Sequence, residues 1–256
     1  MFPLNLGIRA HDLEVRNREE IVQKVSQLHL SHIQFAPQKA FPEQLKLNDM
    51  TLGSAAYFGE YFQKNNIELS ILGCYINLSS KNQEVRAQAL ATFKQQIALC
   101  SAYQAKMIAT ETGSVSVGFT KENFGVTVAV EAGINHPIYN YLLAKRLVDE
   151  VASPNLKIIL DCANLIHKEN HADQEKVIRG ALDNLQGCIT ALHLKDYIME
   201  NGKIRIVPVG KGCLDFRPVL HYIKYERPLM YATLEATPEI YVPEAIEHLQ
   251  FFYQDC

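Results

Sequence analysis

Acidic and imidazole side chains end the last four short apolar runs of the sequence. They are Glu131, Asp161, His193 and Glu235. A carboxylate at the end of a buried run needs a partner there. If the four side chains converge, a bound cation is the simplest way to neutralise three carboxylates. Oxygen and nitrogen donors suit Mn²⁺, Mg²⁺, Co²⁺ or Zn²⁺, so the sequence predicts one such divalent metal ion. The alternative is that each residue is solvated in a loop.

Other polar residues near these run ends could contact a substrate. His136 lies in the loop after Glu131, and functional groups concentrate on such loops. Glu111 ends the fourth apolar run, where it could instead hydrogen-bond the neighbouring loop. We expect Lys195 to contact the substrate. We expect Arg205 and Lys211 to hold an anionic or hydroxyl-rich substrate, and a solvated loop cation is the alternative for Arg205.

Two more side chains follow candidate ligands closely in the sequence. Asn164 comes three residues after Asp161, and Asp196 comes three residues after His193. An amide or a carboxylate in such a place can hydrogen-bond a ligand and orient it. We therefore expect Asn164 and Asp196 to support the ligands without touching the ion.

The elements of the fold determine whether these residues meet. Eight short apolar runs are typical of strands: 4–9, 32–36, 68–78, 106–111, 125–131, 157–161, 188–194 and 230–235. Amphipathic runs between them predict helices: 17–28, 54–65, 82–103, 137–151, 173–185, 216–224 and 242–253. Alternation indicates a parallel sheet, and eight repeats in 256 residues indicate a closed (β/α)8 TIM barrel, one domain over residues 1–256. A doubly wound open sheet is the alternative. The carboxyl ends of barrel strands line one mouth, which is where the candidate residues lie.

One connection departs from this pattern. Residues 112–124, between the fourth and fifth predicted strands, show no helical periodicity. We expect the fourth barrel helix to be missing or shortened, which would expose one flank of the barrel. Because an exposed apolar flank is usually covered by a partner, we also expect a homo-oligomer, most simply a dimer.

The composition is that of an ordinary globular protein, with 48% hydrophobic and 21% charged residues. A net charge of −3 gives no overall electrostatic attraction to nucleic acid or to an anionic membrane. No apolar run approaches the ~20 residues that span a bilayer, and no signal-peptide pattern is visible. The six cysteines are scattered without a CxxC pair, which favours reduced thiols. We expect a cytoplasmic protein that acts on a small molecule.

Several motifs together resemble the xylose isomerase-like TIM barrels, and among them the sugar phosphate isomerases and epimerases. The motifs are VAVEA, LKIILDCANL, ALHLKD, PVGKGCLDF and TLEAT. The resemblance covers most of the chain and implies one divalent ion held by a Glu, an Asp, a His and a Glu. Matched by position, these are Glu131, Asp161, His193 and Glu235. The family also includes a zinc-dependent endonuclease, but the early strand ends here carry Gln34, Tyr75 and Asn77 instead of further histidines.

The reaction that we expect is proton transfer at the carbon beside a ketose carbonyl. Glu131 and Glu235 would stand on opposite faces of that carbon as an acid/base pair. The divalent ion would stabilise the negative charge that develops on the substrate oxygens. This predicts an isomerase or epimerase of a sugar or sugar phosphate. An inosose-type dehydratase, which is a lyase with the same first step, is one alternative. A sugar-binding barrel that has lost its activity is another.

Overall fold

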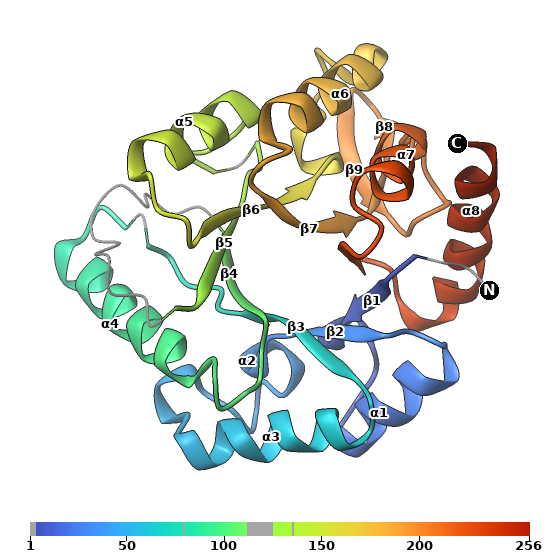
Figure 1. The fold of residues 1–256 in the computed structure, drawn as a ribbon. Helices are drawn as coiled ribbons and strands as arrows, with labels where there is room; N and C mark the ends of the chain where they lie inside the picture. Colours follow the sequence, from blue (N-terminus) through green and yellow to red (C-terminus); the bar gives the residue numbers. More distant parts are fainter. Residues whose placement is uncertain (1–3, 79, 112–124, 135) are drawn as a thin grey trace.

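Eight parallel strands close into a barrel in the order β1-β10-β7-β6-β5-β4-β3-β2, and the helices surround it (Figure 1). The computed structural model describes residues 4–78, 80–111, 125–134 and 136–256, and of Glu111 only the backbone. The barrel strands are β1 (Leu6–Arg9), β2 (His32–Phe35), β3 (Glu68–Gly73), β4 (Met107–Glu111), β5 (Thr127–Glu131), β6 (Leu156–Asp161), β7 (Ile189–Leu194) and β10 (Tyr231–Leu234). The predicted TIM barrel is confirmed, and the open-sheet alternative is wrong.

The helices are α1 (Arg18–Gln27), α2 (Pro37–Ala40), α3 (Leu52–Lys64), α4 (Gln83–Leu99), α5 (Tyr141–Val151), α6 (Gln174–Leu185), α7 (Arg217–Tyr225) and α8 (Val242–Asp255). Side-chain caps set where several of them begin. The side chains of Asn17, Asn82 and Asn140 accept hydrogen bonds from backbone N–H groups of the first turns of α1, α4 and α5. These caps satisfy N–H groups that have no partner inside the helix, which fixes each helix start.

The alternation of side chains along each strand determines what faces the barrel interior. Inside the barrel, a small apolar cluster contains Ala129 of β5, Ile159 of β6 and Ala191 of β7. Because side chains two residues apart share a face of the sheet, the residues at positions 131, 161 and 193 also face inward. They lie at the carboxyl ends of their strands, one layer above the apolar cluster. A larger cluster fills the space between the sheet and the helices.

Strand β3 is shorter than the sequence predicted. It ends at Gly73, although the backbone N–H of Cys74 still donates to the carbonyl of Ala109 at 2.9 Å. The chain then turns so that the ring of Tyr75 packs against Gly73, where an added Cβ would lie 2.8 Å from the ring. Residues 74–78 therefore form a loop at the mouth of the barrel and do not continue the strand.

An antiparallel hairpin between β7 and α7 was not predicted. It consists of β8 (Asp196–Glu200) and β9 (Lys203–Val207). Its two-residue turn is Asn201-Gly202, with φ of 50° and 71°. Two positive φ angles are typical of a type I′ turn, and Asn-Gly between alternating apolar residues is the usual sequence signal for such a hairpin. The signal is present in the sequence and was not used.

Strands β4 and β5 pair directly, from Met107 with Thr127 onward. The predicted loss of a helix between them falls on residues 112–124, which lie outside the described residues. The oligomer that we inferred from that loss stays a prediction. None of the helices that the structure describes combines the length and the apolar character that a membrane span requires.

Gly59 of α3 packs against the backbone of the turn after α4, and a substitution at Gly59 can test this packing. A Cβ at Gly59 would lie 2.4 Å from the carbonyl oxygen of Tyr103, whereas at Gly53, in the same helix, the nearest such atom is 3.8 Å away. We expect Gly59→Ala to lower the free energy of unfolding by about 1–3 kcal/mol through overpacking. Gly53→Ala should raise it by up to ~1 kcal/mol, because Ala favours helix. Urea unfolding measures both, and equal effects would contradict the packing.

Candidate metal centre

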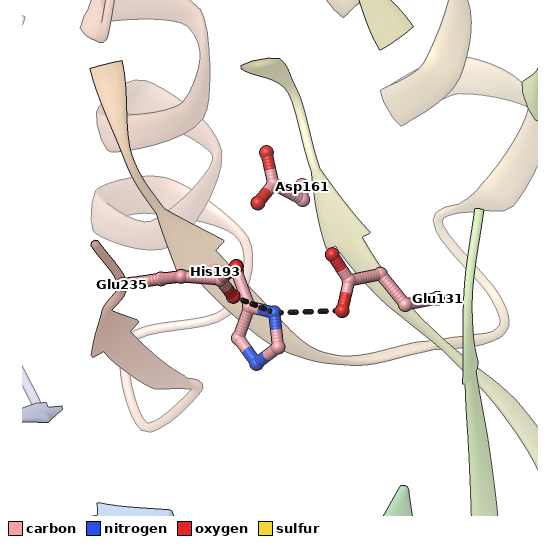
Figure 2. Close-up of side chains that lie close together, drawn as sticks. All are labelled: Glu131, Asp161, His193 and Glu235. Atoms are coloured by element: carbon pink, nitrogen blue, oxygen red, sulfur yellow. Dashed lines mark ion pairs between the residues drawn. The ribbon is translucent and has the colours of Figure 1, made fainter. Parts of the chain in front are cut away.

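Four side chains from consecutive strands converge at the carboxyl-terminal mouth of the barrel (Figure 2). They are Glu131 at the end of β5, Asp161 at the end of β6, His193 on β7 and Glu235 directly after β10. All four are buried, and one ligand atom of each lies within 4.8 Å of those of the others. The predicted meeting of these residues at a common centre is confirmed.

The ring nitrogen Nδ1 of His193 lies at the middle of this group. It is 3.0 Å from Oε2 of Glu131 and 2.8 Å from Oε2 of Glu235, and the two carboxylates approach it from opposite sides (Figure 2). Nδ1 of His193 and Oδ2 of Asp161 are both buried, and among the described residues they are held by ion pairs and not by hydrogen bonds of good geometry. Buried polar atoms normally have a hydrogen-bond partner. Two such atoms among three carboxylates fit the donor set of a divalent cation.

Asn164 holds the remaining oxygens of two ligands. Its amide nitrogen donates to Oε1 of Glu131, and its backbone N–H donates to Oδ1 of Asp161 at 3.0 Å. The 3-10 turn Ala163–Leu165, which directly follows β6, places both donors. Each carboxylate is thereby left with one oxygen to offer to the centre. These contacts are those expected of a residue that orients the ligands.

Two cations hold the outer oxygen of Glu235. Lys195 donates to Oε1 at 3.0 Å, and Nη1 of Arg9 lies 2.9 Å from the same atom. Lys195 also lies 3.1 Å from Oδ2 of Asp161. Arg9 is itself clamped by both oxygens of Asp12, each at 2.8 Å. We expected Lys195 to contact substrate, but its ammonium is instead engaged by two ligand carboxylates.

Gln34 of β2 fixes the orientation of the His193 ring. Its Oε1 lies 2.7 Å from Nε2 of His193, and its amide nitrogen donates to the hydroxyl of Tyr75. Since the amide oxygen faces the ring, Nε2 carries a proton and Nδ1 is the atom free to bind a metal. Gln34 is fully buried. Sequence reasoning had noted it only as a strand end without a histidine.

The charges of the centre shift its pKa values in opposite directions. Burial disfavours the imidazolium of His193, but the carboxylates of Glu131 and Glu235 outweigh it and raise the pKa to about 10. Burial raises the pKa of Asp161 to about 6, and Lys195 opposes this rise. For Glu235, burial is outweighed by His193, Lys195 and Arg9, which hold its pKa well below the usual range. The centre without a metal therefore keeps a proton on His193.

Asp196 does not contact a ligand in the way that we predicted. Its carboxylate accepts hydrogen bonds at 2.8 to 3.1 Å from four backbone N–H groups, those of Tyr197, Gly210, Gly212 and Leu214. A Cβ at Gly212 would lie 2.3 Å from Oδ1 of Asp196, so glycine is needed there. The role of Asp196 is thus to shape the loop between β9 and α7. A carboxylate can satisfy several N–H groups of such a loop at once, and this competing role could not be read from its spacing to His193.

Three other residues that we expected to contact substrate are Arg205, His136 and Glu111. Arg205 lies on β9 and forms an exposed ion pair with Glu200, 2.9 Å apart, so nothing in its surroundings points to a substrate. His136 is half-buried in the loop after β5, where its ring and Asn164 both flank Gly133. This places His136 beside a residue that orients two ligands. The side chain of Glu111 lies outside the described residues.

Sequence reasoning assigned no role to the residues that follow the first three strands. Arg9 ends β1, His11 lies in the turn after it, and Tyr75 follows β3. Lys39, in α2 after β2, lies with its ammonium 3.5 Å from the centre of the Tyr75 ring. The signal that could have found them is the one that found the ligands, because every strand end of a barrel opens at the same mouth.

The family and the solved structures agree with this fold. A family model described as "Xylose isomerase-like TIM barrel" matches residues 117–252, and the chain belongs to that family. No curated protein matches the chain at a significant level. Among solved structures, an IolI protein with a bound zinc atom is 19% identical, with a TM-score of 0.69 and coverage of 98% of this chain and 97% of that one.

Two further solved structures have the same fold. A probable 3-DHS dehydratase, AsbF, from Bacillus anthracis is 14% identical, with a TM-score of 0.71 and coverage of 96% of this chain and 98% of that one. The 3-keto-D-glucoside 4-epimerase YcjR from E. coli is 12% identical, with a TM-score of 0.72 and coverage of 97% and 99%. At these identities the likeness shows the fold, and the chemistry rests on the residues described above.

Replacing Gln34 tests whether it sets the tautomer of His193. We expect Gln34→Leu to weaken binding of Mn²⁺ or Zn²⁺ by roughly 10- to 100-fold, the usual cost of losing such a support. The ¹⁵N shifts of the His193 ring in the metal-free protein should also change, because Nε2–H loses its acceptor. Gln63→Leu, on the exposed surface of α3, is the matched control and should change neither. Unaltered metal affinity in Gln34→Leu would contradict the assignment.

The raised pKa of His193 predicts how metal binding depends on pH. Because its pKa is about 10, the ring is protonated from about pH 7 to 9, while Asp161, with a pKa of about 6, is ionised. A metal must displace the Nδ1 proton, so affinity should rise about tenfold per pH unit in this range.

Calorimetry in two buffers of different ionisation enthalpy should find about one proton released per ion at pH 8. The exposed His221→Gln variant should release the same number. Binding without any proton release would contradict the protonation state.

Proposed function

We propose that the protein is a divalent-metal-dependent isomerase or epimerase of a sugar or sugar phosphate. The observation that carries the proposal is the pair of carboxylates, Glu131 and Glu235, whose Oε2 atoms face each other across Nδ1 of His193 at 3.0 and 2.8 Å. Two carboxyl groups on opposite sides of one centre suit removal of a proton from one face of a carbon and its return from the other.

The residues divide this work in a definite way. A bound divalent ion would act as a Lewis acid on the substrate carbonyl and its neighbouring hydroxyl. Glu131 takes the proton at Oε2, while Asn164 holds its other oxygen in place. To return a proton to the opposite face, Glu235 would have to enter the reaction protonated and give up that proton while Glu131 keeps the one it removed. The outer oxygen of Glu235 is fixed by Lys195 and Arg9. We assign the first step to Glu131 because two cations bind Glu235 and make it the weaker base.

A dehydratase is the second candidate, and the shared fold of the probable 3-DHS dehydratase favours it. Its first step, proton removal beside a carbonyl, would use the same Glu131. The two reactions then differ in whether the proton returns or a hydroxyl leaves, so the product distinguishes them. A sugar-binding barrel without activity is the third candidate. The complete set of four ligand residues argues against it.

The proposal is tested by metal content and by exchange of the substrate α-proton with D₂O. The purified chain should bind about one divalent ion, and a panel of ketoses and their phosphates with Mn²⁺ should show exchange by NMR. Glu131→Gln should slow exchange by about 10²- to 10⁴-fold, because it removes the general base. Glu169→Gln, an exposed residue in the loop after β6, is the control and should leave the rate unchanged. A chain that binds no metal, or normal exchange in Glu131→Gln, would refute the proposal.

A further inference from the structure

The half of the mouth formed by β1, β2 and β3 contains a second group of polar side chains, which includes none of the four candidate metal ligands. His11, Gln34, Lys39 and Tyr75 form a continuous wall that begins at the metal centre. Gln34 joins His193 to the hydroxyl of Tyr75. The ammonium of Lys39 lies 3.5 Å from the centre of the Tyr75 ring, and the ring of His11 approaches the same Tyr75 edge-on, 6.2 Å between centroids.

His11 and Lys39 have unused hydrogen-bonding capacity. Nδ1 of His11 is buried and has no hydrogen-bond partner among the residues that the structure describes. Lys39 is exposed, and the contact that the described residues give its ammonium is with the face of the Tyr75 ring, not with an acid. A buried ring nitrogen without a partner is costly unless a ligand supplies the missing partner, and the exposed ammonium of Lys39 places a positive charge beside it.

The charges on this wall favour an anion. The positive charges of Arg9, Lys39 and His193 lower the pKa of His11. The carboxylate of Glu235 is the acidic group that raises it most. Burial, with Arg9 and Lys39 nearby, lowers the pKa of His11 to about 3, so the ring is a neutral donor and acceptor. The carboxylate of Asp12, also near, is already bound by Arg9 and by the backbone N–H of Ala236. Asp12 is therefore engaged elsewhere and does not serve as an anionic partner of Lys39.

We propose that this wall is the subsite for an oxyanion group, a carboxylate or a phosphate, at the end of the substrate remote from the reacting carbon. The proposal rests on the proposed function, since the ketose end is assigned to the metal centre. Lys39 supplies the positive charge, and the ring N–H of His11 donates a hydrogen bond. The face of the Tyr75 ring holds the ammonium of Lys39 in position. The substrate is then a keto sugar acid or a ketose phosphate and not a neutral sugar.

The test compares three ketoses that differ only at C6: D-fructose, D-fructuronate and D-fructose 6-phosphate. Their dissociation constants are measured by NMR titration, once with diamagnetic Zn²⁺ and once without added metal. In the natural sequence, at least one charged member should bind about tenfold more tightly than D-fructose, the usual effect of a hydrogen bond to a charged group. Whichever charged member binds more tightly identifies the carboxylate or the phosphate as the group recognised.

Lys39→Met keeps the length of the side chain and removes its charge, so it should abolish most of that tenfold preference. Lys64→Met, at the exposed end of α3 next to the start of β3, is the matched control at the opposite end of the barrel and should preserve it. His11→Phe keeps a ring against Tyr75 and should reduce the preference several-fold. Equal affinities for the three ketoses, or a preference that survives Lys39→Met, would overturn the subsite. Because binding is measured also without metal, failure of the metal centre is distinguished from failure of this inference.

Discussion

Three buried carboxylates at one rim of a barrel repel one another, and the surrounding structure compensates for that repulsion. An isolated ionised carboxylate is costly to bury, and the cost falls only when cations and hydrogen-bond donors surround it. Here Lys195 and Arg9 neutralise Glu235, and Asn164 donates to Glu131 and Asp161. The centre is thus organised before any ion binds, with one oxygen of each carboxylate held from outside and the other directed inward.

The closure of the barrel contributes directly to this organisation. Strand β1 pairs with β10, which brings the first and last strands of the sequence together. Arg9 at the end of β1 therefore lies beside Glu235, and Asp12 holds Arg9 while also accepting the backbone N–H of Ala236. A residue near the amino terminus and a ligand near the carboxyl terminus form one ion-paired network. A barrel that failed to close would lose this support for Glu235, so fold and site are coupled through that network.

Periodicity in the sequence was sufficient to find the four residues that converge at the centre, but not the residues that support them. A strand end and a period of two place Glu131, Asp161 and His193 on the inner face, and both features are visible in the sequence. Lys195 and Gln34 depend on which strands become neighbours across the barrel and on the direction of single side chains, which periodicity does not contain. Asp196 was misassigned because a short spacing to His193 says nothing of a loop fourteen or more residues later. Arg205 was predicted to contact substrate because the Asn-Gly turn was overlooked. That turn forms a hairpin, and Arg205 lies on its second strand, β9.

The arrangement also explains how the ligands stay together without an ion. The ammonium of Lys195 binds the outer oxygen of Glu235, so it does not fill the space between the Oε2 atoms of Glu131 and Glu235. That space is faced by Nδ1 of His193, and the two carboxylates raise its pKa to about 10. A proton on Nδ1 is then a positive charge among the same carboxylate oxygens, and it offsets part of their mutual repulsion.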